Sequence, residues 1–141
     1  MPAATRSIDV NVPPARLMEI ITDFAAYPQF LPEMEEATVL RRDGDVWVAR
    51  FAVKIVRRIE YTLRLVKESE TALSWTLVEG AFRANNGGWK LAPLDGGSKT
   101  RADYSIDLDV GMFVPGTVMK TLVGQSLPAT LEAFKRRAES R

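Results

Sequence analysis

The sequence predicts an α+β fold in which a curved antiparallel β-sheet of about seven strands wraps around a long C-terminal α-helix. Between residues 36 and 110, consecutive segments alternate apolar and polar side chains and are joined by short turns, which is typical of an antiparallel meander. One further alternating segment lies near the N-terminus and is followed by two short helical segments. The chain ends in a long stretch with apolar residues at helical spacing, which can cover the apolar face of the sheet.

The N-terminal segment predicts a strand followed by two short helices. Residues 5–12 alternate as a half-buried strand does, and Pro13 and Pro14 end it. Residues 14–24 carry apolar side chains at helical spacing and predict a short amphipathic helix. The aromatic segment YPQFLPEM (27–34) contains two prolines and predicts a second short helix or a turn.

Six segments after residue 35 predict the remaining strands, and their apolar face is rich in aromatic rings. The alternating segments are 36–42, 46–56, 58–67, 71–78, the segment around Trp89, and 99–110. The rings predicted to share the apolar face belong to Trp47, Phe51, Tyr61, Trp75, Trp89 and Tyr104. The opposite face is charged, and we interpret it as a solvated surface of cross-strand ion pairs.

The stretch from Glu79 to Leu94 predicts a hairpin that connects two of these strands. Gly80 and the run 85–88 (NNGG) tolerate tight turning, and we expect the turn there. Phe82 and Trp89 are large apolar residues close to this turn, so another part of the protein must cover them.

The C-terminal region predicts an irregular apolar crossover followed by the long helix. Residues 111–119 are apolar without regular spacing, and residues 117–138 place apolar side chains on one helical stripe. Pro128 lies inside this stretch, so we expect a kink near Gly124 and Gln125 or a split helix with Ser126 as a new N-cap.

Composition limits the classes of function. A chain of 141 residues with 46% hydrophobic and 26% charged residues predicts a single globular domain over residues 1–141. The net charge of +1 argues against a DNA-binding surface. The absence of cysteine and histidine excludes disulfides, thiolate or histidine metal sites and histidine general bases. Because the sequence shows neither a signal-peptide pattern nor a membrane-spanning apolar run, we expect a cytoplasmic protein.

Periodicity alone leaves open whether the helix and the sheet enclose a filled core or a pocket. Rings on a curved sheet leave room where a helix lifts away from it. For a pocket, the residues predicted to line the wall are Trp47, Phe51, Tyr61, Trp75, Leu77, Trp89, Tyr104 and Leu122. The entrance is predicted at Met112, Phe113 and Met119. Glu79 and Arg83 are the polar candidates near the cavity, and we expect them to pair with each other.

Four motifs connect the chain to a known family: YPQFLPEM (27–34), LVEGAFR (77–83), GGWKLAPL (87–94) and LEAFKRRAE (131–139). With these motifs the whole chain resembles the START-like (SRPBCC) superfamily, which has the helix-grip fold, also called START-like or Bet v 1-like, and includes polyketide cyclases. Within it, the chain is similar to the subfamily of the ribosome association toxin RatA and the coenzyme Q-binding START proteins. It departs from that subfamily at Ala81, where proline is usual, and at Pro128.

The resemblance implies a binding module, with no catalytic residues, no cofactor and no metal. The implied ligand is extended and hydrophobic: a quinone, an isoprenoid or another lipid, bound between the sheet and the C-terminal helix. The implied partners are this small molecule, the large ribosomal subunit (50S) and, transiently, a membrane. The resemblance also allows a polyketide cyclase or aromatase, but without histidine its proton-transfer groups would have to come from tyrosines, Glu79 and Arg83.

Overall fold

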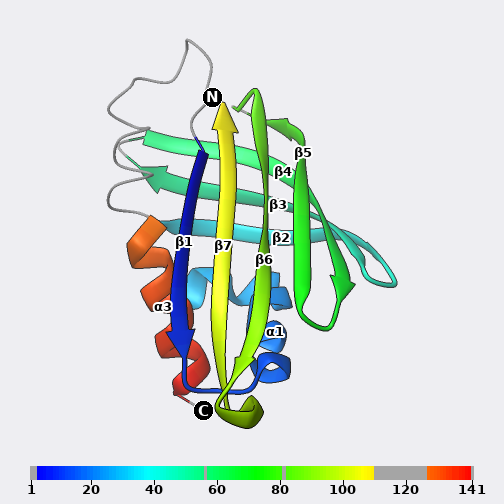
Figure 1. Ribbon diagram of the computed structural model, residues 1–141. Helices are drawn as coiled ribbons and strands as arrows, with labels where there is room; N and C mark the ends of the chain where they lie inside the picture. The colour runs from blue at the N-terminus through cyan, green and yellow to red at the C-terminus, as the bar shows by residue number, and fades with distance from the viewer. Residues whose placement is uncertain (1–2, 56, 81, 110–126, 141) are drawn as a thin grey trace.

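A computed structural model of the protein describes residues 3–55, 57–80, 82–109 and 127–140, and it confirms the predicted α+β fold (Figure 1). Its elements in chain order are β1 (Ala3–Val10), α1 (Pro14–Thr22), the 3₁₀-helix η1 (Phe24–Gln29), β2 (Met34–Asp43), β3 (Val46–Ile55), β4 (Arg57–Ser69), β5 (Ala72–Gly80), β6 (Ala84–Leu94), the 3₁₀-helix η2 (Asp95–Gly97), β7 (Lys99–Asp109) and α3 (Leu127–Glu139). No helix in these ranges is long and apolar enough to cross a membrane.

The seven strands form one antiparallel sheet in the order β1-β7-β6-β5-β4-β3-β2. The sheet is strongly curved, because β2, β3 and β4 run across the direction of β1, β7 and β6 (Figure 1). Two irregularities in the β4–β5 register, between Thr62 and Leu63 and between Lys67 and Ser69, lie where this bend occurs, and such bulges increase twist locally. The pairing of β5 with β6 is short and covers Ala72–Trp75 against Gly87–Lys90.

Helix α3 packs against β1 and α1 and helps to close the concave face of the sheet. Phe134 of α3 makes edge-to-face contacts with the rings of Tyr27 and Trp89, with centroids 5.3 and 5.1 Å apart. At the C-terminal end, Lys135 Nζ donates to the carbonyl of Asp9 at 2.8 Å. These contacts hold the helix over the apolar face that the alternation predicts.

The turn predicted at residues 85–88 is wrong, because this run lies inside β6 and the chain reverses between Gly80 and Ala84. Gly87 allows the neighbouring strand and the Trp75 ring to approach its backbone closely. A Cβ there would overlap Ser105 O and lie 2.7 Å from Trp75 Cζ2. Gly80 is needed for its backbone conformation, because its φ of 141° is one that residues with a side chain rarely adopt. The NNGG run therefore makes room for a neighbouring strand and for the indole of Trp75.

The predicted C-terminal helix is described from Leu127 onward, and Pro128 is the second of its described residues. The first turn of a helix tolerates proline, because its backbone nitrogen needs no intrahelical partner there. The kink expected near Gly124 and Gln125, and the N-cap expected at Ser126, lie outside the described residues.

Candidate ligand-binding cavity

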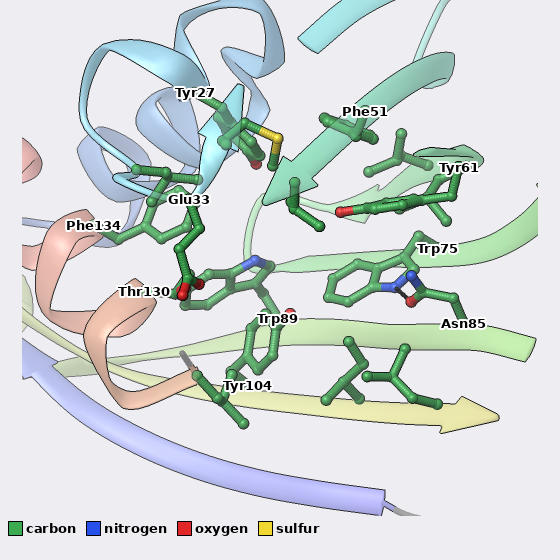
Figure 2. Close-up of a pocket in the computed structure, with 18 of the residues that line it drawn as sticks. Tyr27, Glu33, Phe51, Tyr61, Trp75, Asn85, Trp89, Tyr104, Thr130 and Phe134 are labelled. Carbon is green, nitrogen blue, oxygen red and sulfur yellow. Dashed lines mark hydrogen bonds between the residues drawn. The ribbon is translucent and has the colours of Figure 1, made fainter. Parts of the chain in front are cut away.

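A cavity of about 160 Å³ lies between the concave face of the sheet and the N-terminal end of α3 (Figure 2). Its sheet wall comes from strands β2 to β7, and Leu127, Thr130 and Phe134 of α3 close the opposite side. Tyr27 and Leu31 from the segment around η1 complete the described lining at one end. Of the two alternatives that the sequence left open, a filled core or a pocket between sheet and helix, the structure has a pocket at that place.

Five of the rings that the sequence assigns to the apolar face line this cavity, and each comes from a different strand. They are Phe51 of β3, Tyr61 of β4, Trp75 of β5, Trp89 of β6 and Tyr104 of β7. Alternation along each strand aims a large ring at the concave face, and antiparallel pairing places Phe51 opposite Tyr61 and Trp89 opposite Tyr104. The Trp89 and Tyr104 rings lie 4.9 Å apart, and the Phe51 and Tyr61 rings lie 5.6 Å apart.

Two other predicted wall residues lie away from the cavity lining. Trp47 is buried, with its ring 5.3 Å from that of Phe24 and the guanidinium of Arg42 stacked 4.7 Å above its ring. Leu77 is partly buried and packs against the hydrophobic core. Both residues have a packing role, which the same alternating pattern predicts equally well.

The two predicted polar candidates are exposed and do not line the cavity. The expected ion pair between Glu79 and Arg83 does not occur in the described part of the chain. The remaining predicted residues, namely Met112, Phe113, Met119 and Leu122, lie outside the described residues.

Sequence reasoning did not place several lining residues at the cavity. Three more rings, those of Tyr27, Phe82 and Phe134, lie on its wall. The aromatic motif at 27–34 was the signal for Tyr27, and the helical stripe was the signal for Phe134. The polar lining residues are Glu33, Asn85 and Thr130. Asn85 is in phase with Trp89 on β6, and Thr130 lies at helical spacing from Leu127 and Phe134, but a search for apolar residues passes over polar ones.

The polar groups of the cavity wall differ in how they are satisfied. Trp75 Nε1 donates to Asn85 Oδ1 at 3.0 Å, and the hydroxyl of Tyr27 donates to the carbonyl oxygen of Ile21. Tyr61 and Tyr104 make no hydrogen bond through their hydroxyls to any other described residue. In Figure 2 the oxygen of Tyr61 points toward the middle of the cavity.

The cavity disfavours negative charge. Burial raises the pKa of Tyr61, and burial together with the nearby Tyr61 raises the pKa of Tyr104, so both phenols stay neutral near pH 7. No lysine or arginine occurs among the described lining residues, and Glu33 is the acidic residue among them. Clusters of three or more acidic residues that could hold a metal ion do not occur in the described ranges. The described lining therefore offers apolar surface, the neutral hydroxyl groups of Tyr61 and Tyr104, and the carboxyl group of Glu33.

Comparison with protein families gives a match over residues 10–135 to the family described as polyketide cyclase/dehydrase and lipid transport. Among curated proteins, the ribosome association toxin RatA of Escherichia coli K12 is 27% identical over 110 residues, which cover 77% of this chain and 69% of the toxin.

Solved structures agree with this match. A START superfamily protein of Mycobacterium smegmatis has 25% identity and a TM-score of 0.86, with 98% of this chain and 97% of that chain covered. The Zhui aromatase/cyclase of Streptomyces sp. R1128 has a TM-score of 0.88 at 18% identity, with 99% and 94% covered. At that level of identity the likeness to the Streptomyces protein concerns the fold alone.

Proposed function

Because this chain belongs to the polyketide cyclase/dehydrase and lipid transport family of the START-like superfamily, we propose that it binds a hydrophobic ligand in the sheet–helix cavity without catalysing a reaction. The ligand class is a quinone, an isoprenoid or another lipid. One observation carries the proposal: five aromatic rings from five consecutive strands face one internal space beneath α3. We expect a cytoplasmic protein that contacts a membrane only transiently, when it exchanges its ligand.

The volume of the cavity limits the size of the ligand that the described residues can enclose. A volume of about 160 Å³ is close to that of an engineered apolar cavity of about 150 Å³ that holds one benzene molecule. It is smaller than the roughly 300–1,000 Å³ of typical drug-sized sites. We therefore expect a single ring or a short isoprenoid unit inside, and any longer tail would continue beyond the described wall.

The chemistry of the wall favours binding over catalysis. General acid–base catalysis works best with a group whose pKa lies near the operating pH. The sequence contains no histidine or cysteine, and burial moves the pKa values of Tyr61 and Tyr104 further from neutrality. Apolar burial, at about 25 cal/mol per Å² of surface removed from water, supplies the free energy of binding instead.

Native mass spectrometry with a short-chain prenylated para-benzoquinone tests the proposal. We expect a 1:1 complex with the wild-type protein and little complex with Ile106→Phe, because Ile106 lines the cavity and a phenylalanine there fills part of it. Ser105→Phe is the matched control, since Ser105 is the exposed neighbour of Ile106 on β7 and does not line this cavity. Absence of a complex with the wild-type protein, or equal complexes for the wild type and Ile106→Phe, would contradict the proposal.

A second candidate function, association with the large ribosomal subunit, is favoured by the 27% identity to the ribosome association toxin. Much of the basic surface is occupied by internal contacts: Arg58 pairs with Glu35, Glu36 and Glu60. Sucrose-gradient sedimentation with purified 50S subunits tests this function. Co-sedimentation that weakens steeply with salt is expected for phosphate contacts, and an unchanged profile at low salt would exclude it.

A further inference from the structure

Two hydroxyl groups on the cavity wall have no partner within the described part of the protein. Tyr61 of β4 and Tyr104 of β7 both line the cavity, and no hydrogen bond among the described residues engages either phenol oxygen. Among the described side chains, Asp107 Oδ1 is the polar atom that is both fully buried and without a partner. The phenol oxygens of Tyr61 and Tyr104 are therefore not fully enclosed by protein atoms. The two hydroxyls therefore open onto the space of the cavity.

Other polar groups of the same wall are satisfied by the protein. The hydroxyl of Tyr27 donates to the backbone of Ile21, and the indole nitrogen of Trp75 donates to Asn85. An indole N–H can only donate, so this bond fixes the orientation of the Asn85 amide. Pairing is the general rule for buried polar groups, because an unpaired donor loses its hydrogen bonds to water without replacement. Two donors on one apolar wall that have no partner among the described residues are the arrangement expected where a ligand supplies the acceptor.

The positions of the two tyrosines are held by packing, so their hydroxyls are preorganised. The ring of Tyr104 lies between those of Trp75 and Trp89, at 5.4 and 4.9 Å. The ring of Tyr61 lies between those of Phe51 and Phe82, at 5.6 and 5.3 Å. Rings flanked on two sides change rotamer rarely, so little conformational entropy is lost when a ligand accepts the hydrogen bond.

The charge of the wall restricts the ligand further. An anionic ligand would need a cation or several donors to offset the loss of its hydration. Lysine and arginine do not occur among the described lining residues. Burial disfavours the ionised form of both tyrosines and so raises their pKa values, and the same loss of hydration would oppose an anionic ligand.

From this arrangement we propose that the cavity selects a neutral ligand with a carbonyl-type hydrogen-bond acceptor, and that Tyr61 and Tyr104 are the donors that recognise it. The inference rests on the proposed function, because it concerns the ligand of the same cavity. It adds a charge requirement, which excludes fatty-acid carboxylates, and it assigns specificity to two residues.

Three single-ring probes of similar shape test the proposal: acetophenone carries a neutral acceptor, cumene is apolar and benzoate is anionic. Affinities for the intact protein are measured by titration calorimetry at pH 7. The informative quantity is the ratio of acetophenone affinity to cumene affinity, because it cancels changes in apolar burial. We expect the double variant Tyr61→Phe/Tyr104→Phe to lower this ratio by about fivefold or more, as the loss of one neutral hydrogen bond implies.

Tyr27→Phe is the matched control, because its ring lines the same cavity while its hydroxyl is used by the protein itself. This variant should leave the ratio unchanged. Benzoate should bind at least tenfold more weakly than acetophenone to the wild-type protein. An unchanged ratio in the double variant, or benzoate binding as strong as that of acetophenone, overturns the inference. If cumene still binds in either case, hydrophobic binding itself stands; if no probe binds, the proposed function fails as well.

Discussion

The three tyrosines of the cavity wall show how one side chain takes different roles through its surroundings. Burial raises the pKa of each, so all three are neutral near pH 7. Tyr27 uses its hydroxyl to satisfy the carbonyl of Ile21, whereas Tyr61 and Tyr104 present theirs to the cavity. The first contributes to stability, and we assign the other two to recognition.

This difference predicts that removing the hydroxyl group affects the stability of the ligand-free protein much more at Tyr27 than at Tyr61. Tyr27→Phe should lower the free energy of unfolding by about 1–3 kcal/mol, because it leaves a buried carbonyl without its donor. Tyr61→Phe should change it by less than about 0.5 kcal/mol, since no described partner loses a hydrogen bond. Urea denaturation followed by far-UV circular dichroism measures both. A loss for Tyr61→Phe as large as that for Tyr27→Phe would show that its hydroxyl is structural.

The close packing around Gly87 predicts that an alanine at this position destabilises the protein. The methyl group of Gly87→Ala would overlap the backbone of Ser105 and lie 2.7 Å from the indole of Trp75, so we expect a loss of about 1–3 kcal/mol. The near-UV circular dichroism should also change, because Trp75 must move. In the control Asn86→Ala the change is at the exposed neighbour of Gly87 on β6, so that variant should leave the tryptophan signal unchanged. An unaltered signal in Gly87→Ala would contradict the close approach.

At the scale of elements, the C-terminal end of α3 is tied to the end of β1 through Glu139. Its carboxylate accepts from Lys135 Nζ at 2.7 Å and from the backbone nitrogen of Asn11 at 2.8 Å. These hydrogen bonds, that of Lys135 first, lower the pKa of Glu139 below its ordinary value of 4.5. A carboxyl group with a lowered pKa stabilises the folded state when it is ionised.

The stabilisation by Glu139 should therefore depend on pH. It is fully present above about pH 5, and it is lost as the pH falls below 4.5 and through the lower pKa of the folded state. At pH 7, Glu139→Gln should lower the free energy of unfolding by about 1 kcal/mol or less, and this difference should shrink as the pH falls below 4.5. Glu132→Gln, on the exposed side of the same helix, should have little effect at pH 7. A difference that persists at low pH would contradict the role of the ionised carboxyl group.

The sequence predicts most strands correctly, and its error at β6 has a physical reason. Strong alternation predicted the strands well, because it reports which side chains face the core. The NNGG run was predicted to be a turn and not part of β6, because glycine and asparagine are common in turns. The sequence does not show that Trp75 lies close to Gly87 and leaves no room for a side chain there. Pro128 falls in the first turn of α3 as described, where proline fits.

For the whole molecule, the order of the elements predicted the fold, whereas the cavity depended on the tertiary structure. Periodicity shows which face of a strand is apolar, but the distance between sheet and helix depends on how the curved sheet meets α3. The pattern therefore placed Trp47 with the other rings, although it packs against Phe24. Glu33 lies before β2 and outside its alternation, whereas Asn85 is in phase with Trp89 on β6 and was missed because the NNGG run was predicted to be a turn.

The most direct test of the central claim is a crystal structure of the protein with a short-chain prenylated para-benzoquinone. We predict electron density for the quinone ring among Tyr61, Trp89 and Phe134, with a carbonyl oxygen within about 3 Å of a tyrosine hydroxyl. A cavity filled by side chains, or a quinone bound only on the outer surface, would contradict the assignment of this space as a binding site.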